Sequence, residues 1–410
     1  MQKNQQQIVV QNDLRPAYYD DFRCLMSDCQ LNCCKNDWNI SFGKKDYLKL
    51  KKQKGTPELN QRLAHCLRRV RGENANEFNN YAKFVIENGQ CPLLSENCLC
   101  TLQQEKGHRV LPEVCRDFPR RKLYSPTGYL DRALSPACEG VLALLWDLPQ
   151  GIDFKSDPLP EHERETGLYT EDNLLVPFAQ DIRSICIDIL QNRHFSLPER
   201  ILLLGMALKP LAEGQTDLPA WLEKAQALAE STAVNGMLAS QEQDKALPLF
   251  LTNNINMLFS PKNHSTNSLT LQLIAKSWLG LEFQDETFQL ETEPYLQAKE
   301  RFAKQFGSRE YFMENLMVSV FFYLGFPKVD SPERLWKSYL DFCTLYSMYR
   351  FAAVMSCRED SPGDKNELFQ LLVHVSRFFL HRIDGRAYLQ ESLLKNDSAS
   401  LGAMAILLSG

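Results

Sequence analysis

The sequence lacks both an apolar segment near its N-terminus and any long apolar run. Its first thirteen residues, MQKNQQQIVVQND, contain no apolar stretch of the length that a secretory signal needs. The longest apolar runs, such as residues 318–324, fall far short of the about 18 residues that a membrane-spanning helix requires. We therefore expect a cytoplasmic protein that does not use a membrane as a partner.

An excess of positive charge is also missing. The 410 residues include 46 lysine and arginine residues against 51 aspartate and glutamate residues, which gives a formal net charge of −5. This balance offers no overall electrostatic case for nucleic-acid binding, so we expect no nucleic acid as a partner. The local basic clusters at 68–71 and 120–122 are short, and we interpret them as solvated surface or as contacts with a protein partner.

Cysteine, in contrast, is abundant, and ten of the thirteen cysteines lie within the first 138 residues. Cytoplasmic conditions keep thiols reduced, which favours metal binding or redox chemistry, and an odd total fits a disulfide framework poorly. Disulfides and simple burial of the thiols remain as alternatives. Eight cysteines form a spaced constellation that begins with a C-x4-C-x3-C-C run: Cys24, Cys29, Cys33, Cys34, Cys91, Cys100, Cys115 and Cys138.

The cysteine spacing does not by itself choose the metal. Thiolate sulfur binds both iron and zinc well, but the sequence has neither the C-x2-C knuckles of zinc sites nor the usual ferredoxin spacings. Neighbouring side chains diverge, so Cys33 and Cys34 are not both expected at one small metal centre. Eight thiols exceed the four that one zinc ion or one cluster needs, which predicts either a second site or several structural thiols.

The chain is expected to be mainly α-helical and to have three parts. Residues 1–146 are a Cys-rich N-terminal metal-binding domain of loops and short helices, 147–167 are a linker rich in proline and charge, and 168–410 are an all-helical C-terminal domain. One-sided apolar stripes, as in 178–193 and 367–382, predict helices, and so do the helix-start signals at 196–199 and 331–333. Alternation typical of strands is scarce.

Two further groups of side chains lie near the cysteines, and each has alternative roles. Four aromatic rings could hold a cation against their faces or could simply pack around the loops. They are Tyr18, Tyr19, Trp38 and Tyr47. Three arginines could donate N–H groups to thiolates or could form ordinary salt bridges. They are Arg116, Arg120 and Arg132.

The cysteine motifs resemble those of the flagellin lysine-N-methylase family. They read FRCLMSDCQLNCCKNDWNI at 22–40, CPLLSENCLCTL at 91–102, CRDFPR at 115–120 and DRALSPACE at 131–139. The helical half adds IRSICIDILQNR at 182–193, SLPERILLLG at 196–205, ENLMVSVF at 314–321 and VSRFFLH at 375–381. The N-terminal motifs are also similar to zinc- or iron-chelating Cys-rich proteins, whereas the helical half favours the methylase. Cys98 is an additional cysteine, and SPACEG around Cys138 replaces the more usual SCPEA.

The resemblance implies a protein-lysine N-methyltransferase that transfers methyl groups from S-adenosylmethionine to lysine side chains of flagellin. It also implies an iron–sulfur cluster of the 4Fe–4S type held by the N-terminal cysteines, with zinc as the alternative metal. The pattern G-x-G-x-x-G is absent, so the methyl donor is not expected in the familiar glycine-rich site. Catalytic and cofactor-binding residues cannot be named from the sequence. The alternative function is a non-enzymatic zinc- or iron-binding module that docks a protein partner.

Overall fold

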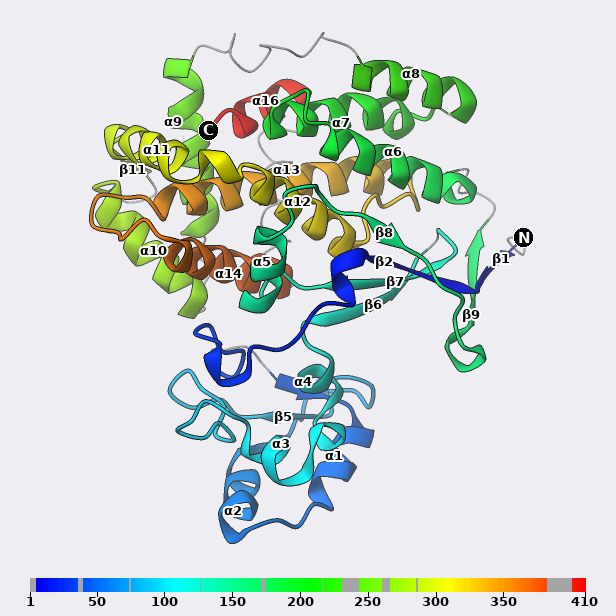
Figure 1. The fold of residues 1–410 in the computed structure, drawn as a ribbon, viewed down its shortest axis with the longest axis vertical. Helices are drawn as coiled ribbons and strands as arrows, with labels where there is room; N and C mark the ends of the chain where they lie inside the picture. The colour runs from blue at the N-terminus through cyan, green and yellow to red at the C-terminus, as the bar shows by residue number, and fades with distance from the viewer. Residues whose placement is uncertain are drawn as a thin grey trace.

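The computed structural model shows a large helical body with a smaller Cys-rich module beneath it (Figure 1). It describes residues 5–381 and 400–410, apart from 36–39, 74, 126, 171–174, 216, 231–242, 260–265 and 285–286. The Cys-rich module carries α1 to α4, and the body carries α5 to α16 together with a small sheet. The prediction of a mainly α-helical protein is confirmed.

The helices of the body begin and end where local signals place them. At the start of the helix Leu197–Ala212, the Ser196 backbone N–H donates to Glu199 Oε2 at 2.9 Å, as a capping box requires. Just beyond the end of the same helix, Gly214 takes a left-handed φ of +95°. The helices are α6 (Ala179–Gln191), α7 (Leu197–Ala212), α8 (Leu218–Glu230), α9 (Gln243–Leu258), α10 (Thr266–Trp278), α11 (Glu293–Phe306), α12 (Tyr311–Leu324), α13 (Pro332–Met355), α14 (Lys365–His381) and α16 (Leu401–Leu408).

The C-terminal part is not all-helical, so this element of the prediction is wrong. Strands β10 (Glu282–Gln284) and β11 (Thr287–Gln289) pair antiparallel between α10 and α11. Phe283 and Phe288 face each other across the pair, with ring centroids 5.7 Å apart. A three-residue strand is too short for alternation to stand out from the flanking helical pattern, which is why the sequence did not predict it.

The segment 147–167, expected to be a linker, carries strand β8 (Phe154–Lys155) and the start of β9 (Glu165–Thr170). Strand β9 pairs antiparallel with β1 (Gln5–Val10), and β8 pairs antiparallel with β2 (Asn12–Pro16). Strand β2 also lies parallel to β7 (Tyr129–Leu134), which pairs antiparallel with β6 (Arg120–Tyr124). The resulting sheet has the order β6-β7-β2-β8, and it joins the two ends of the N-terminal region to the helical body.

The Cys-rich module has a hydrophobic core of its own, to which Phe42, Leu59 and Phe84 contribute. Its sheet has the order β3-β5-β4, with antiparallel neighbours throughout. Its elements are β3 (Ile40–Phe42), α1 (Lys44–Lys51), α2 (Pro57–Cys66), β4 (Leu67–Arg69), β5 (Ala82–Phe84), α3 (Thr101–Lys106) and α4 (Glu113–Asp117).

The two cores do not meet at the predicted domain boundary. Helix α5 (Glu139–Trp146) and residues Tyr18 and Leu134 belong to the large core of the body, although they lie within the first 146 residues. The buried residues of the independent core lie between Ile40 and Leu111. The division into domains at 146 and 168 stays a prediction. Within residues 1–146, packing sets the Cys-rich module apart as a shorter segment with its own core.

Helix α12 holds the body together through buried polar side chains. Tyr18 donates its hydroxyl to Ser319 at 2.9 Å, and the Asn315 side-chain amide donates to the carbonyl of Leu148 at 2.7 Å. Each of these hydrogen bonds spans more than a hundred residues of sequence. Buried polar groups must be satisfied, so these bonds fix how the turn at Ala17–Tyr19 and the residues after α5 pack on α12.

Glu314 on the same helix is 2% exposed and lies between two arginines. Its carboxylate accepts from Arg193 at 2.9 Å and from Arg200 at 2.6 Å. Arg200 is itself buried and also donates to the carbonyl of Phe195 at 2.7 Å. This triad ties the turn between α6 and α7 to α12.

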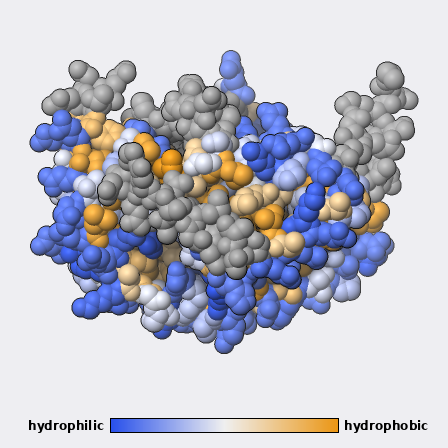
Figure 2. All heavy atoms as spheres, turned by 90° about the horizontal axis from the view of Figure 1, so that it is seen from above, coloured by the Kyte–Doolittle hydropathy of each residue, from blue (hydrophilic) through white to orange (hydrophobic). Residues whose placement is uncertain are grey.

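The surface of the body gives no sign of a membrane span. None of the helices in the described part of the chain is both long and apolar enough to cross a membrane. Seen from above, apolar patches are interrupted by hydrophilic residues (Figure 2). Exposed apolar side chains such as Leu249 and Leu273 are common on ordinary protein surfaces and carry no functional argument on their own.

Candidate metal centre of clustered thiols

All eight predicted cysteines lie where the Cys-rich module meets the helical body. All thirteen cysteines of the chain are free thiols, so the alternative of a disulfide framework has no support. The eight come from the loop at 24–34, the turn at 91–100, helix α4 and the residue before α5. They fall into two sets, according to whether they pack against the core of the Cys-rich module or lie near the start of α5.

The first set, which we call the core thiols, packs against the core of the Cys-rich module. Its members are Cys34, Cys91, Cys100 and Cys115. Burial raises the pKa of Cys91 to about 11, and Cys100 acts in the same direction. Burial also raises the pKa of Cys115 well above its usual value, and Cys91 and Cys100 add to this effect. These thiols therefore stay protonated at neutral pH unless a metal displaces the proton.

The second set, which we call the interface thiols, lies beside α5. Its members are Cys24, Cys29, Cys33 and Cys138. The Cys29 thiol donates to Glu139 Oε2 at 3.4 Å. Burial raises the pKa of Cys29, and the Glu139 carboxylate, Cys138 and Cys33 act in the same direction. Burial raises the pKa of Cys138 to about 12. Cys24 and Cys33 are exposed, so this set is open on one side.

The adjacent pair Cys33–Cys34 connects the two sets, because its two thiols form a hydrogen bond with each other instead of diverging as expected. Cys33 also lies close enough to Cys91, Cys100 and Cys115 to raise the pKa of each. A hydrogen bond with the Cys34 thiol lowers the pKa of Cys33 to about 7, and the positive charge of Arg377 acts in the same direction. The same hydrogen bond raises the pKa of Cys34, and burial of the Cys34 thiol is the second cause of this rise. Cys33 is therefore the thiol of this pair that ionises first.

Leu31 fastens the first cysteine loop to the helical body through its backbone. Its N–H donates to Glu139 Oε2 at 2.8 Å, and its carbonyl accepts from Arg377 Nη2 at 2.5 Å. Arg377 lies on α14 and is 4% exposed. Helices α5 and α14 lie side by side at the underside of the body, next to this loop (Figure 1). The helical body thus contributes directly to the surroundings of the interface thiols.

Asn32 fastens the same loop to the Cys-rich module. Its side-chain amide donates to the carbonyl of Cys98 at 2.9 Å, and its Oδ1 accepts from the Cys34 N–H at 2.8 Å. The N–H of Cys91 in turn donates to the carbonyl of Cys34 at 2.8 Å. Cys98 is therefore a structural neighbour of the thiols through its backbone, which gives the additional cysteine a place without giving its sulfur a role.

Sequence reasoning missed three residues of this site. Glu139 and Arg377 were part of the quoted motifs but had no assigned role, and only Glu139, next to Cys138, had a local signal. Cys66 on α2 is buried, and Cys91 and Cys100 lie close enough to raise its pKa. It resembled any apolar helix residue in the sequence. In the described part of the chain, no three His, Cys, Asp or Glu side chains lie close enough together to hold a single metal ion.

The predicted aromatic group does not form one site. Tyr18 belongs to the core of the body, whereas Tyr47 packs against the core of the Cys-rich module. Tyr19 lies with its ring 5.8 Å from the guanidinium of Arg120, and Trp38 lies outside the described residues. Packing is therefore the role that the structure supports for Tyr18.

Two of the three flanking arginines form salt bridges. Arg116 pairs with Asp117 at 2.9 Å, and Arg132 pairs with Asp13 at 2.8 Å. Arg120 instead places its guanidinium 4.9 Å from the ring of Phe22. The salt-bridge alternative is therefore confirmed for Arg116 and Arg132.

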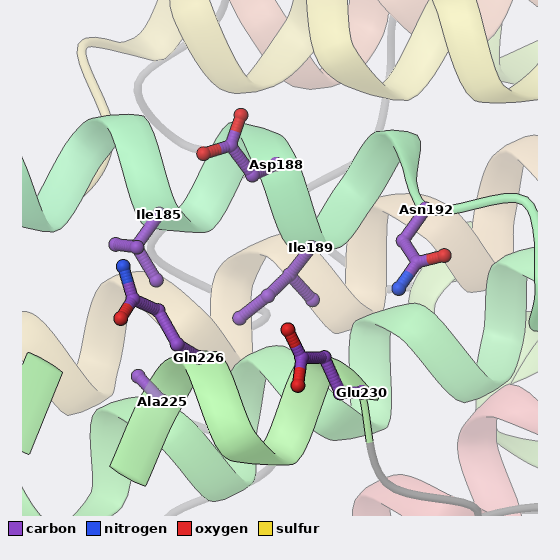
Figure 3. Close-up of a pocket in the computed structure, with 7 residues that line it drawn as sticks. All are labelled: Ile185, Asp188, Ile189, Asn192, Ala225, Gln226 and Glu230. Atoms are coloured by element: carbon purple, nitrogen blue, oxygen red, sulfur yellow. The ribbon is translucent and has the colours of Figure 1, made fainter. Parts of the chain in front are cut away.

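A hollow of about 400 Å³ lies between α6 and α8 (Figure 3). Burial raises the pKa of Asp188, one of its two acidic residues. In Figure 1 these helices lie at the opposite end of the molecule from α1 to α4, so the hollow does not adjoin the thiols. Its lining residues are Ile185, Asp188, Ile189, Asn192, Ala225, Gln226 and Glu230.

Comparison with known proteins relates the helical body to a described family. Residues 183–407 match the model of the FliB lysine N-methylase C-terminal domain. The chain is 28% identical over 182 residues to the lysine-N-methylases of Salmonella choleraesuis and Salmonella typhimurium, which covers 44% of this chain and 43% of each relative. It is 27% identical over 137 residues to the flagellar biosynthetic protein FliU of Salmonella muenchen, which covers 33% of this chain and 78% of that protein. No solved structure matches the chain.

Proposed function

Because the chain belongs to the FliB lysine N-methylase family, we propose that it transfers methyl groups from S-adenosylmethionine to lysine side chains of flagellin. The match of the helical body to the family domain carries this proposal. The chain spans less than half of the length of the two lysine-N-methylases that it matches, so the activity of those proteins is proposed for it and not transferred as a fact.

The reaction places modest demands on the protein. A lysine amine is a nucleophile once it is deprotonated, and its usual pKa of about 10.4 means that a site must desolvate it or supply a base. The sulfonium methyl group of the donor is activated by its own charge, so transfer depends mainly on alignment of the two reactants. Radical chemistry is not needed to methylate an amine, because the nitrogen lone pair suffices.

We further propose that the interface thiols hold an iron–sulfur cluster. The set supplies four sulfur ligands, the number that one cluster takes. Thiolates on one zinc ion lie about 3.8 Å apart, because each Zn–S bond is about 2.3 Å long. Cluster thiolates bind different iron atoms and therefore stand farther apart than the ligands of a single ion. The positive charge of Arg377 suits an anionic cluster, and a bound cluster would supply either a structural link or an anchor for the methyl donor.

The activity is tested by incubating the purified protein with flagellin and S-adenosylmethionine that carries a labelled methyl group. We expect the label in methylated lysine residues of flagellin, identified by mass spectrometry of its peptides. A flagellin preparation in which the lysines have been acetylated is the matched control and should take up no label. Absence of transfer to untreated flagellin by anaerobically purified protein would refute the proposed activity.

Substitution of single cysteines tests the placement of the cluster. In protein purified without oxygen, we expect about four iron and four sulfide per chain and broad absorption at about 400 nm. Cys138→Ser removes a proposed ligand and is expected to abolish the absorption and most of the iron. Cys186→Ser, which alters a buried thiol of α6 in the body, should leave both unchanged.

Cys91→Ser decides between the two thiol sets in the same measurements. The variant should keep its iron if the cluster sits on the interface thiols, while the Cys-rich module loses stability. Iron that stays in Cys138→Ser but disappears in Cys91→Ser would move the cluster to the core thiols. Colourless protein that contains zinc would replace the cluster by a structural metal site.

A further inference from the structure

The Cys-rich module carries a concentration of positive charge that its chain as a whole does not share. Residues 44–71 include ten lysine and arginine residues and two acidic ones, whereas the complete sequence has 46 basic and 51 acidic residues. The positive charge is therefore concentrated in a stretch of 28 residues that includes α1, α2 and β4, and the remainder of the protein is acidic.

Three of these cations are used inside the module. Lys44 pairs with Glu77 at 2.6 Å, Lys49 with Asp46 at 2.9 Å and Arg62 with Glu58 at 2.8 Å. The remaining seven are exposed, and no ion pair joins them to another residue in the part of the chain that the structure describes. We call them the basic face: Lys45, Lys51, Lys52, Lys54, Arg68, Arg69 and Arg71.

Two tyrosines bring the centre of the basic face together. The rings of Tyr47 on α1 and Tyr81 next to β5 lie 5.5 Å apart, edge to face. The guanidinium of Arg69 lies 3.8 Å from the centre of the Tyr81 ring, and Lys51 lies 5.9 Å from the Tyr47 ring. Lys51 of α1 and Arg69 of β4 therefore lie against the same pair of rings, which brings these two elements together at one surface.

The basic face adjoins the thiols. Two side chains of α1 bind the segment around α4. Asp46 Oδ2 accepts from the Glu113 backbone N–H at 2.9 Å, and Lys49 Nζ donates to the carbonyl of Leu111 at 3.1 Å. These contacts hold α4, which carries Cys115. Tyr47 packs against the same small core as Cys34, Cys91 and Cys100. A partner on the basic face is thereby brought to the module that contains the core thiols.

We propose that the basic face docks an acidic segment of the protein substrate and so holds neighbouring lysines of that substrate beside the Cys-rich module. This inference rests on the proposed function for the identity of the partner. The exposed cations of the face complement the carboxylates of an acidic protein segment, and the acidic remainder of the chain limits this attraction to the one stretch. Charges farther apart than about 8 Å are largely screened at physiological salt, so the face itself acts only on a segment seated on it.

The test compares two triple variants with the same change in net charge. One carries Lys51→Glu, Lys52→Glu and Lys54→Glu on the basic face. The control carries Lys224→Glu, Lys276→Glu and Lys304→Glu, three exposed lysines of α8, α10 and α11. Poly-L-glutamate serves as the binding probe, and the KM for flagellin is measured in parallel. All six positions are exposed, so both variants are expected to fold.

The basic-face variant is expected to lose at least tenfold in affinity for poly-L-glutamate and to show a correspondingly higher KM, while kcat and the control variant stay unchanged. Binding by the wild type should weaken as salt is added. Equal binding of poly-L-glutamate by both variants would overturn the proposal, and so would tighter, equally salt-sensitive binding of single-stranded DNA. If the wild type methylates nothing, the binding measurement still shows whether the basic face binds an acidic chain. A failure of the proposed activity is thereby distinguished from a failure of the proposed docking surface.

Discussion

Replacing Glu314 with alanine is expected to lower the free energy of unfolding by about 3–5 kcal/mol, the typical cost of removing one partner from a buried ion pair. The carboxylate is 2% exposed and accepts from both Arg193 and Arg200. Its loss leaves the buried guanidinium of Arg200 without its counter-ion and opens a cavity beside α12. Denaturant titration followed by circular dichroism measures the change.

Glu58→Ala is the matched control for this prediction. Glu58 also pairs with an arginine, at 2.8 Å, but its side chain is 69% exposed. Exposed pairs contribute about 0–1 kcal/mol, so the control is expected to unfold almost as the wild type does. Glu314→Gln, which keeps the shape and removes the charge, should fall between the two. A loss below about 1 kcal/mol in Glu314→Ala would show that the triad does not hold the α6–α7 turn in place.

Replacing Arg377 with alanine is expected to weaken metal binding by about 10–100-fold, the usual effect of losing a partner of the ligands. The guanidinium holds the carbonyl of Leu31, while Glu139 holds the N–H of the same residue. Without Arg377 the loop that supplies Cys29 and Cys33 loses one of the hydrogen bonds that fasten it to the helical body, and Glu139 keeps the other. Competition with an external chelator measures the affinity.

Arg301→Ala is the control for the Arg377 variant. Arg301 on α11 also donates to a backbone carbonyl, that of Cys357, at 2.7 Å, but it lies in the helical body and not beside the proposed ligands. It is expected to retain the metal. Arg377→Lys keeps the charge without the planar fork and should bind the metal with intermediate affinity. If Arg377→Ala held the metal as tightly as the wild type does, the prediction that α14 supports metal binding by the interface thiols would be wrong.

Local signals in the sequence were sufficient for most of the helical body. The capping box formed by Ser196 and Glu199 starts α7, and the one-sided apolar stripe of 178–193 becomes α6. Both signals act within a few residues, so they survive without knowledge of the tertiary fold. The strands were harder to predict, because β8 has two residues and β2 finds its partner β7 more than a hundred positions away.

The sequence by itself determined that the chain is mainly helical and that eight spaced cysteines are the candidates for a metal centre. Only the tertiary structure decided how those thiols divide into two sets, because the direction of Cys33 and Cys34 depends on contacts with Asn32 and with each other. It also decided that Arg377, 346 residues from Leu31, completes the site. Packing of α14 against α5 creates that contact, and no pattern within a short window of sequence encodes it.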